Sequence, residues 1–277
     1  MSLSNLTVAV TSSRRGTELA HLIKAFGGIP YIVPTIGITN AQPISHEVNI
    51  FINSVLRERI DYFVFMTGPS VHYFFRIASN LGVKEELITV IRDSTVISRS
   101  DKPSYILRTF GISTDLFPDE STEKGILKLL KSRDMKDKKI AIIWHGTSNR
   151  TFKMELESEG SSVLELSSYS YSLSLDETAD TILKQMGYKY LKPKIESILK
   201  LFNDIAGGLV HVITFTSPPS VFELMKVADI HNYRQSLLSS LNENVIVTSV
   251  GPSTTEALNR NGITVDVMPT VYKMGPM

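Results

Sequence analysis

Three short segments rich in Ser, Thr and Gly carry the side chains best suited to chemistry in this chain. They are Thr67-Gly68-Pro69-Ser70, Thr216-Ser217-Pro218-Pro219-Ser220 and Gly251-Pro252-Ser253-Thr254. Each is expected at the N-terminus of a helix. Unpaired backbone N–H groups and the positive end of a helix dipole bind carboxylate or phosphate without a charged side chain. The segments together predict a site for a polyanion, while simple N-capping is the alternative for any one of them alone.

The chain repeats itself over a long distance. Asp61–Phe75 and His211–Met225 share four residues at matching positions, so that Phe65, Pro69, Ser70 and Val71 recur as Phe215, Pro219, Ser220 and Val221. Weaker echoes relate 100–118 to 251–269 and 8–35 to 141–168. The period is far longer than the roughly 20 to 50 residues of a solenoid repeat. The sequence therefore predicts a duplicated domain, with two similar lobes that face each other.

Each repeated unit reads as a buried strand, a polar turn and a helix. Val64–Met66 and Val212–Phe215 are apolar runs of strand length, and apolar residues follow at helical spacing in Val71–Leu81 and Val221–Val227. Alternating strands and helices predict parallel sheets with right-handed crossovers, which is a doubly wound α/β fold. In such folds the turns at the carboxyl ends of the strands line the ligand crevice. We therefore expect the polar turns to form the site.

Composition narrows the class of protein. A length of 277 residues suits two domains of roughly 130 residues each. The apolar runs are too short to span a bilayer, and the first residues lack the features of a secretory signal. The chain has no cysteine, which excludes disulfides, thiolate metal sites and a cysteine nucleophile, and its net charge of +1 shows no global basic bias. We expect a cytoplasmic monomer without nucleic-acid or membrane partners.

Common catalytic and cofactor motifs do not occur in the sequence. There is no GxGxxG, no GxxxxGK[ST], no HExxH and no GxSxG. The six histidines show no spacing typical of metal ligands, and each is more simply structural or solvated. We therefore expect no metal and no cofactor.

Leu175–Gly208 is the one irregular stretch. It predicts a helix over Asp176–Gln185, an interruption at Gly187 and Pro193, and a second helix through Ile195 and Ile205. Five lysines decorate it, namely Lys184, Lys189, Lys192, Lys194 and Lys200. They read as a solvated helical surface, in preference to a basic lid over an anionic ligand.

At these polar turns the chain resembles the uroporphyrinogen-III synthase family over nearly its whole length. The family's Phe-Thr-Ser-Pro after a strand occurs at 215–218 and loosely at 65–68. Its Val-Gly-Pro-x-Thr-x-x-Ala-Leu stretch matches 250–258, and its Gly-[IL]-x-[VT] matches 262–265. The tyrosine of its Val-Tyr-x-Thr hinge falls on Tyr169. The order and spacing of these motifs together carry the resemblance.

The chain also departs from the family's pattern. The first Gly-Pro-x-Thr turn is replaced by 100–103, Ser-Asp-Lys-Pro. The opening Val-Thr-Arg-Pro is replaced by 10–13, Val-Thr-Ser-Ser, although Arg14 follows. The second Arg-Gly is His145-Gly146, with Arg150 retained. Backbone N–H donors survive such changes except at proline.

The resemblance implies an architecture and an activity. The architecture is α/β, with two similar lobes that are each a parallel sheet flanked by helices, joined by two strand-like linkers near 35–38 and 168–171. Lobe 1 would be residues 1–35 with 172–277, and lobe 2 residues 37–170. The family closes linear hydroxymethylbilane, which carries eight carboxylates, to uroporphyrinogen III with loss of water and inversion of ring D. That task is chiefly the control of geometry.

The resemblance also suggests site residues. Tyr169 would donate a hydrogen bond to the departing hydroxyl, although an aromatic side chain with a satisfied hydroxyl is the alternative there. The expected substrate-binding residues are Arg14, Thr67, Gly68, Ser70, Ser100, His145, Gly146, Thr216, Ser217, Ser220, Gly251, Ser253 and Thr254. Two other functions stay open, a non-catalytic two-lobed binding protein for a small polyanion and a nucleotide-dependent α/β enzyme without the standard motifs.

Overall fold

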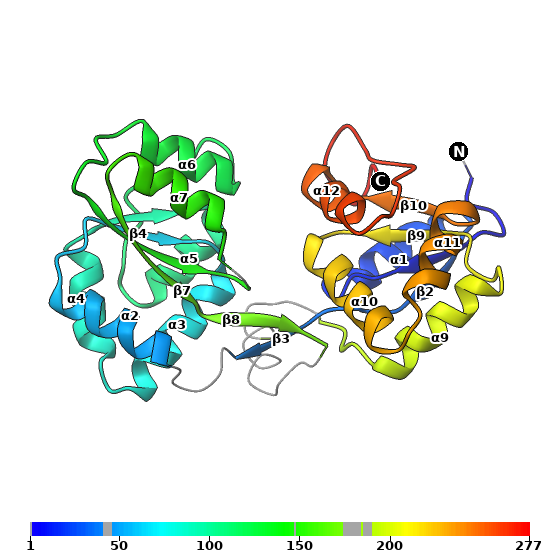
Figure 1. The fold of residues 1–277 in the computed structure, drawn as a ribbon, viewed down its shortest axis with the longest axis horizontal. Helices are drawn as coiled ribbons and strands as arrows, with labels where there is room; N and C mark the ends of the chain where they lie inside the picture. The colour runs from blue at the N-terminus through cyan, green and yellow to red at the C-terminus, as the bar shows by residue number, and fades with distance from the viewer. Residues whose placement is uncertain (1, 41–45, 147, 174–183, 185–189) are drawn as a thin grey trace. The chain divides into compact units, whose positions relative to one another are not determined.

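The computed structural model describes residues 2–40, 46–146, 148–173, 184 and 190–277. Its internal contacts divide the chain into two compact units. Unit 1 is Met1–Thr39 with Tyr171–Met277, and unit 2 is Asn40–Ser170. Unit 1 therefore combines the start of the chain with its second half, as the blue and the yellow-to-red ribbons show (Figure 1).

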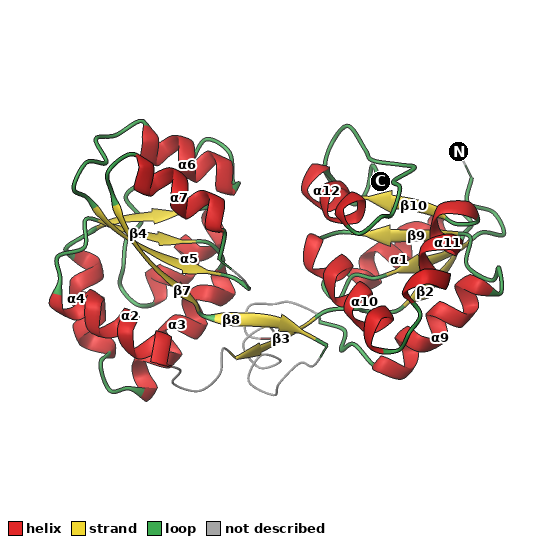
Figure 2. Cartoon of the chain, viewed as in Figure 1, coloured by secondary structure: helices red, strands yellow, loops and turns green. Residues whose placement is uncertain are grey.

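Unit 1 is a four-stranded sheet of order β10-β9-β1-β2 with helices packed on it (Figure 2). Its strands are β1 (Thr7–Val10), β2 (Ile29–Ile32), β9 (Val212–Phe215) and β10 (Ile246–Ser249). Its helices are α1 (Gly16–Ala25), α9 (Ile195–Ala206), α10 (Pro218–Ile230), α11 (Arg234–Glu243) and α12 (Pro252–Arg260). All pairings are parallel, and β1 pairs with both β2 and β9, so residues 8–10 lie beside residues 212–214.

The core of unit 1 follows the alternation of side chains along its strands. Ala9 and Ile213 face a large cluster with the apolar sides of α9, α10, α11 and α12. Val8, Val10 and Val212 face the other way and pack with Leu19 and Ile23 of α1. Both faces of the sheet are thus covered, as a parallel sheet requires.

Unit 2 is a second four-stranded parallel sheet, of order β5-β4-β6-β7. Its strands are β4 (Tyr62–Phe65), β5 (Thr95–Ser98), β6 (Lys139–Trp144) and β7 (Ser162–Ser167). Its helices are α2 (His46–Arg57), α3 (Gly68–Asn80), α4 (Lys84–Arg92), α5 (Asp101–Thr109), α6 (Glu123–Lys131) and α7 (Arg150–Ser158). On one face Val64, Ile142 and Trp144 pack with α6 and α7. On the other face Phe65 packs edge-on against Phe74 of α3.

A two-stranded sheet carries the chain between the units. It pairs β3 (Gly37–Asn40) with β8 (Tyr169–Ser172), and both changes of unit along the chain fall within these strands. The predicted fold class, with two similar lobes and two strand-like linkers, is confirmed.

Most predicted elements are confirmed. The strand at Val212–Phe215 has the predicted bounds, and the helices predicted from Val71 and Val221 begin three residues earlier, at Gly68 and Pro218, because polar residues of the turn form the first helical turn. The helix predicted from Ile195 is α9. The helix predicted over Asp176–Gln185 lies outside the described residues except for Lys184. No helix in the described part of the chain is long and apolar enough to cross a membrane.

Candidate functional site

The carboxyl ends of the strands lie at one edge of each sheet because every pairing within it is parallel. In unit 1 this edge bears the turns that follow β1, β9 and β10, which contain Arg14, Thr216 and Gly251. In unit 2 it bears the turns after β4, β5 and β6, which contain Thr67, Ser100 and His145, and the start of β8, where Tyr169 follows β7 by two residues. The fold thus gathers the predicted site residues into two sets, one at the carboxyl edge of each sheet.

Thr67 and Ser70 form a reciprocal cap on α3. The Thr67 hydroxyl oxygen accepts from the Ser70 N–H at 3.1 Å, and the Ser70 hydroxyl oxygen accepts from the Thr67 N–H at 3.1 Å. The Ser70 hydroxyl also donates to the Thr67 carbonyl at 2.7 Å. Ser70 is fully buried. The Ser70 hydroxyl is therefore engaged in ordering the turn, in which Thr67 is partly exposed and Gly68 is buried.

The start of α10 offers fewer backbone donors than that of α3. Its first two residues are Pro218 and Pro219, which have no N–H, and the cap residue Ser217 makes no side-chain capping bond. Ser220 is buried and donates its hydroxyl to the Ser217 carbonyl at 2.7 Å. Donors at this turn are therefore the hydroxyls of Thr216 and Ser217, which are partly exposed.

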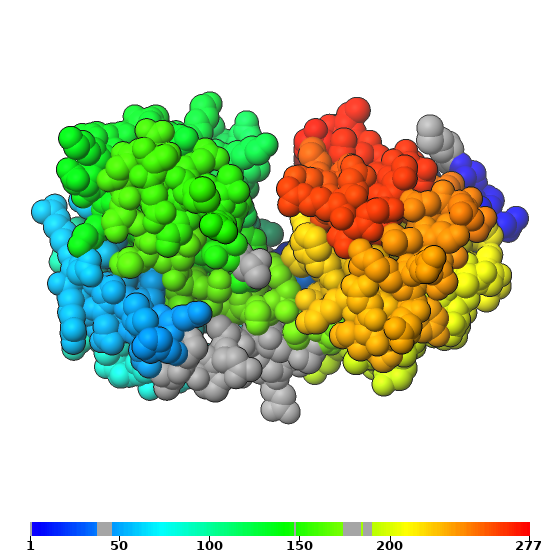
Figure 3. All heavy atoms as spheres, in the orientation of Figure 1, coloured from blue at the N-terminus to red at the C-terminus, as the bar shows by residue number. Residues whose placement is uncertain are grey.

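The start of α12 has a third arrangement. Gly251 is the cap residue, Pro252 follows it, and the Thr254 N–H donates back to the Gly251 carbonyl at 3.1 Å. Thr254 is buried and Ser253 is exposed. A Cβ built on Gly251 would lie 3.3 Å from Tyr272, so the C-terminal segment closely approaches this turn. Figure 3 shows that segment in red beside the orange surface of α12.

The turn after β1 is tied down by contacts that sequence analysis missed. The Ser12 hydroxyl bonds with that of Thr216, and the Ser13 hydroxyl donates to the carbonyl of Ile36. The Leu191 N–H donates to the Ser13 carbonyl at 2.9 Å, and the Tyr190 hydroxyl donates to the Ile36 carbonyl at 3.0 Å. Tyr190 and Leu191 come from the stretch expected to be a solvated surface, and lie within the interruption that Gly187 and Pro193 indicated in the sequence.

Arg14 and Arg15 are exposed on this same turn. Arg15 has a left-handed backbone, with φ of 59°, and caps α1 without a side-chain capping bond. Its guanidinium pairs with Glu18. Of the five lysines noted in the sequence, Lys200 forms a surface pair with Asp204 at 2.6 Å.

In unit 2 the turn after β6 meets the first residue of β8. The Gly146 N–H donates to the Tyr169 carbonyl at 3.1 Å, and Gly146 has a φ of 68°, which favours glycine. His145 is partly buried. Ser100 caps α5 without a side-chain capping bond, and its carbonyl accepts from the Ser98 hydroxyl at 2.9 Å.

Tyr169 lies between the turn after β4 and helix α3. Its phenolic oxygen is 3.4 Å from the Thr67 hydroxyl oxygen, and its ring centroid is 5.4 Å from that of Tyr73. Only 2% of Tyr169 is exposed. The structure thus brings together Thr67, Gly146 and Tyr169, which are more than a hundred residues apart at the extremes.

Two glutamates, one in each unit, have a raised pKa. Burial raises the pKa of Glu223 on α10, and its Oε2 has no hydrogen-bond partner among the described residues. Burial also raises the pKa of Glu165 on β7, against the opposing effects of the Trp144 indole and of Lys153. No group of three or more His, Asp or Glu side chains in the described part of the chain is arranged to hold a metal ion.

Comparison with known proteins identifies the family. The family model of uroporphyrinogen-III synthase HemD matches residues 17–277. The chain belongs to this family. A putative uroporphyrinogen-III synthase of Methanothermobacter thermautotrophicus is 25% identical to it over 95% of this chain and 92% of that protein. An uncharacterized protein of Bacillus subtilis, YjjA, is 26% identical over 98% of this chain and 92% of that protein.

A solved structure supports the same fold. The crystal structure of a mutant uroporphyrinogen III synthase from the extremely thermophilic bacterium Thermus thermophilus aligns with a TM-score of 0.64 and 21% identity. The alignment covers 98% of this chain and 94% of that one. The resemblance inferred from the motifs is confirmed at the level of family and fold.

Proposed function

We propose that this chain is a uroporphyrinogen-III synthase. It would close linear hydroxymethylbilane to uroporphyrinogen III, with loss of water and inversion of ring D, as a cytoplasmic monomer that needs no cofactor. The observation that carries the proposal is the family match over residues 17–277, combined with hydroxyl groups at the carboxyl edges of both sheets. These groups suit a substrate with many carboxylates.

Substrate binding would rest on many modest contacts. In unit 1 the proposed donors are the hydroxyls of Thr216, Ser217 and Ser253 and the guanidinium of Arg14, all at least partly exposed. In unit 2 they are the Thr67 hydroxyl and the N–H groups at the starts of α3 and α5, with Ser100, His145 and Gly146 alongside. Ser70, Ser220 and Thr254 are buried, so we assign them to shaping the turns, and Gly251 to close approach of the backbone.

The chemical step needs a donor at the departing hydroxyl. The lone pair of the adjacent pyrrole nitrogen expels this group, which leaves as water once it takes up a proton. Tyr169 is proposed to donate the hydrogen bond that assists departure. Its contact with Thr67 is long for a hydroxyl pair, so it costs little to exchange it for one with the substrate. Because Tyr169 is buried, the turns around it must part when substrate binds.

The ring closure itself is a matter of geometry. Ring D must be attacked at its substituted position, which gives a spiro intermediate and then the inverted ring. The spontaneous reaction attacks the unsubstituted position and gives the symmetric I isomer. A protein that holds the linear substrate folded and excludes water would favour the III isomer.

Incubation of the protein with hydroxymethylbilane, followed by separation of the product isomers, tests the proposal. A synthase yields the III isomer. A non-catalytic binding protein for a polyanion would return the linear substrate or its spontaneous I product, and that outcome would overturn the proposal.

A further inference from the structure

Glu165 is a half-buried carboxylate with no part in the chemistry described so far. It lies on β7, in register with Ile142 of β6. Its Oε1 accepts from the indole N–H of Trp144 at 2.6 Å, and its Oε2 lies 3.7 Å from Nζ of Lys153 on α7. One carboxylate thus joins the last residue of β6 to α7.

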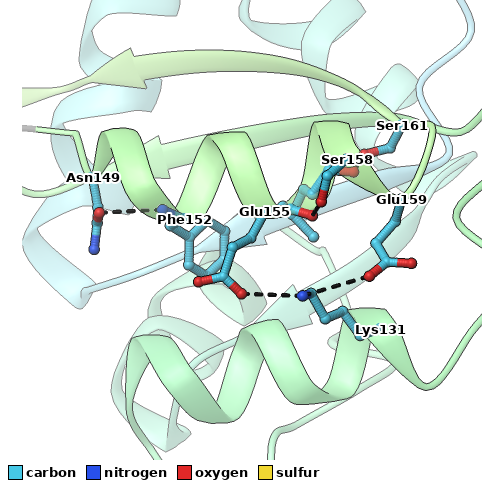
Figure 4. A network of polar contacts seen from close by, with 8 residues as sticks. Lys131, Asn149, Phe152, Glu155, Ser158, Glu159 and Ser161 are labelled. Carbon is cyan, nitrogen blue, oxygen red and sulfur yellow. Dashed lines mark hydrogen bonds and ion pairs between the residues drawn. The ribbon is translucent and has the colours of Figure 1, made fainter.

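Helix α7, which carries Lys153, is itself firmly held (Figure 4). The Asn149 side chain caps it by accepting from the Phe152 N–H at 3.2 Å. Lys131 of α6 pairs with Glu155 at 3.0 Å and with Glu159 at 3.5 Å. Lys153 is therefore presented to Glu165 from an ordered helix.

Hydrogen bonds link Trp144 to the segment that carries Tyr169. Its ring is fully buried and packs edge-on against Phe152 at 5.3 Å. Its carbonyl accepts from the Ser168 hydroxyl at 3.2 Å and from the Ser168 N–H at 3.4 Å. Two residues further on, the Gly146 N–H donates to the Tyr169 carbonyl. The backbone of Ser168 and Tyr169 is thus fixed to the segment that begins at Trp144.

We propose that Glu165 is a positioning residue for Tyr169, acting through the Trp144 indole. The expected effect of Glu165 on the reaction rate rests on the proposed function, whereas its expected effect on the position of Tyr169 does not. A hydrogen bond to a charged acceptor is stronger than one to a neutral acceptor, and a buried indole N–H without an acceptor would force the ring to move. A movement that reaches the backbone of Trp144, at the end of β6, would displace its carbonyl and with it the bonds that hold Ser168 and Tyr169.

The variants separate this role from general stability. Glu165→Leu removes the acceptor, whereas Glu165→Gln keeps a neutral one and should restore part of the effect. Glu157→Leu is the matched control, because Glu157 also faces Lys153, at 3.8 Å, but makes no contact with Trp144 in the described structure.

Fluorine NMR reports on Tyr169 without any need for activity. Protein labelled with 3-fluorotyrosine gives a Tyr169 resonance that is assigned by its loss in Tyr169→Phe. We expect this resonance to shift in Glu165→Leu, to shift less in Glu165→Gln, and to stay in place in Glu157→Leu. An unmoved resonance in Glu165→Leu would overturn the inference. If that variant does not fold, the smaller shift expected in Glu165→Gln is the test, and an unmoved resonance there overturns the inference.

Kinetics then test the consequence for the proposed reaction. Glu165→Leu should lower kcat about tenfold with KM unchanged, because a misplaced donor affects the chemical step and not binding. In a Tyr169→Phe background the same change should have no further effect. Equal losses in both backgrounds would show that Glu165 does not act through Tyr169. If the wild-type protein makes no III isomer, the proposed function fails while the fluorine result still decides the positioning role.

Discussion

The phenolic oxygen of Tyr169 lies 3.4 Å from the hydroxyl oxygen of Thr67, the residue that caps α3. This pairing places a hydroxyl donor at the N-terminus of a helix, where negative charge is favoured. The departing hydroxyl of the proposed substrate develops negative charge as it leaves. This geometry supports the proposal that Tyr169 assists its departure.

Replacement of Tyr169 by phenylalanine should separate chemistry from packing. We expect kcat to fall about tenfold or more, because general acids of this kind contribute about 10² to 10⁴ in rate. The melting temperature should hardly change, since the ring still packs on Tyr73 and the contact with Thr67 is long. The product should stay the III isomer.

Tyr62→Phe is the control for that experiment. Tyr62 begins β4 and so lies at the opposite end of this strand from the turn of Thr67. Its loss of a hydroxyl should leave kcat as in the wild type. An unchanged kcat in Tyr169→Phe would remove the catalytic assignment and leave departure to the pyrrole nitrogen alone.

Ser70 and Ser217 occupy similar turns but should respond differently to alanine. Ser70→Ala removes the buried hydroxyl that accepts from the Thr67 N–H and donates to the Thr67 carbonyl, and should lower the free energy of unfolding of unit 2 by about 1 kcal/mol. Ser217→Ala removes no capping bond and should leave stability unchanged while it weakens substrate binding by about 0.5 to 2 kcal/mol.

Denaturant titration and steady-state kinetics distinguish the two serines. Trp144 is the single tryptophan of the chain and lies in unit 2, so its emission follows the unfolding of that unit. Complete loss of activity in a folded Ser70→Ala protein would show that its hydroxyl contributes more than a cap.

The fold could be predicted from sequence because strand and helix patterns are local. The repeat of Phe65 and Ser70 at Phe215 and Ser220 is enough to mark both strand-turn-helix units. The use of each hydroxyl could not be predicted in this way. Ser70 and Ser217 both look like cap residues, yet which of them bonds its own helix depends on backbone angles and on which residue occupies the cap position.

Glu223 should make unit 1 less stable as pH rises. Burial raises its pKa in the folded protein above the ordinary value of 4.5, so the unfolded chain loses its proton first. The stability of unit 1 therefore falls as pH rises from 4.5 through the raised pKa of the folded protein. The contribution is fully present below pH 4.5. Glu223→Gln should increase the free energy of unfolding at pH 7 by about 1 kcal/mol and have little effect near pH 4.

Circular dichroism is the measurement for Glu223, because the tryptophan reports only on unit 2. The unit 2 transition followed by Trp144 should not change in Glu223→Gln and serves as an internal control. Glu196→Gln, at an exposed position in the first turn of α9, removes a charge that favours the helix N-terminus and should not raise stability at either pH. A stabilisation of Glu223→Gln that is equal at both pH values would contradict the assignment to ionisation.

Tyr190 should stabilise the turn after β1. Tyr190→Phe removes the hydrogen bond to the Ile36 carbonyl and should cost about 0.5 to 1.5 kcal/mol of stability in unit 1. Amide exchange at Leu191, whose N–H bonds the Ser13 carbonyl, should become faster. Tyr272→Phe, at an exposed tyrosine, is the control and should change neither quantity. Unchanged exchange in Tyr190→Phe would show that the backbone bonds alone hold this segment.

The contacts of Tyr190 and Trp144 show what sequence patterns cannot supply. The Tyr190 hydroxyl bonds the carbonyl of Ile36, which is 154 positions away, and the Trp144 indole bonds Glu165 on the neighbouring strand. Both contacts depend on tertiary packing and have no local signal. The parts of the candidate site that come from strand ends were therefore predictable, and the side chains that hold those ends in place were not.

The fraction of III isomer formed from hydroxymethylbilane, measured as the concentration of wild-type protein is raised, tests the proposed function most directly. Without protein the substrate closes spontaneously to the I isomer. We predict that the III fraction rises with protein concentration until it dominates, because the catalysed closure then outpaces the spontaneous one. A product that stays entirely the I isomer at every protein concentration would contradict the assignment of this chain as a synthase.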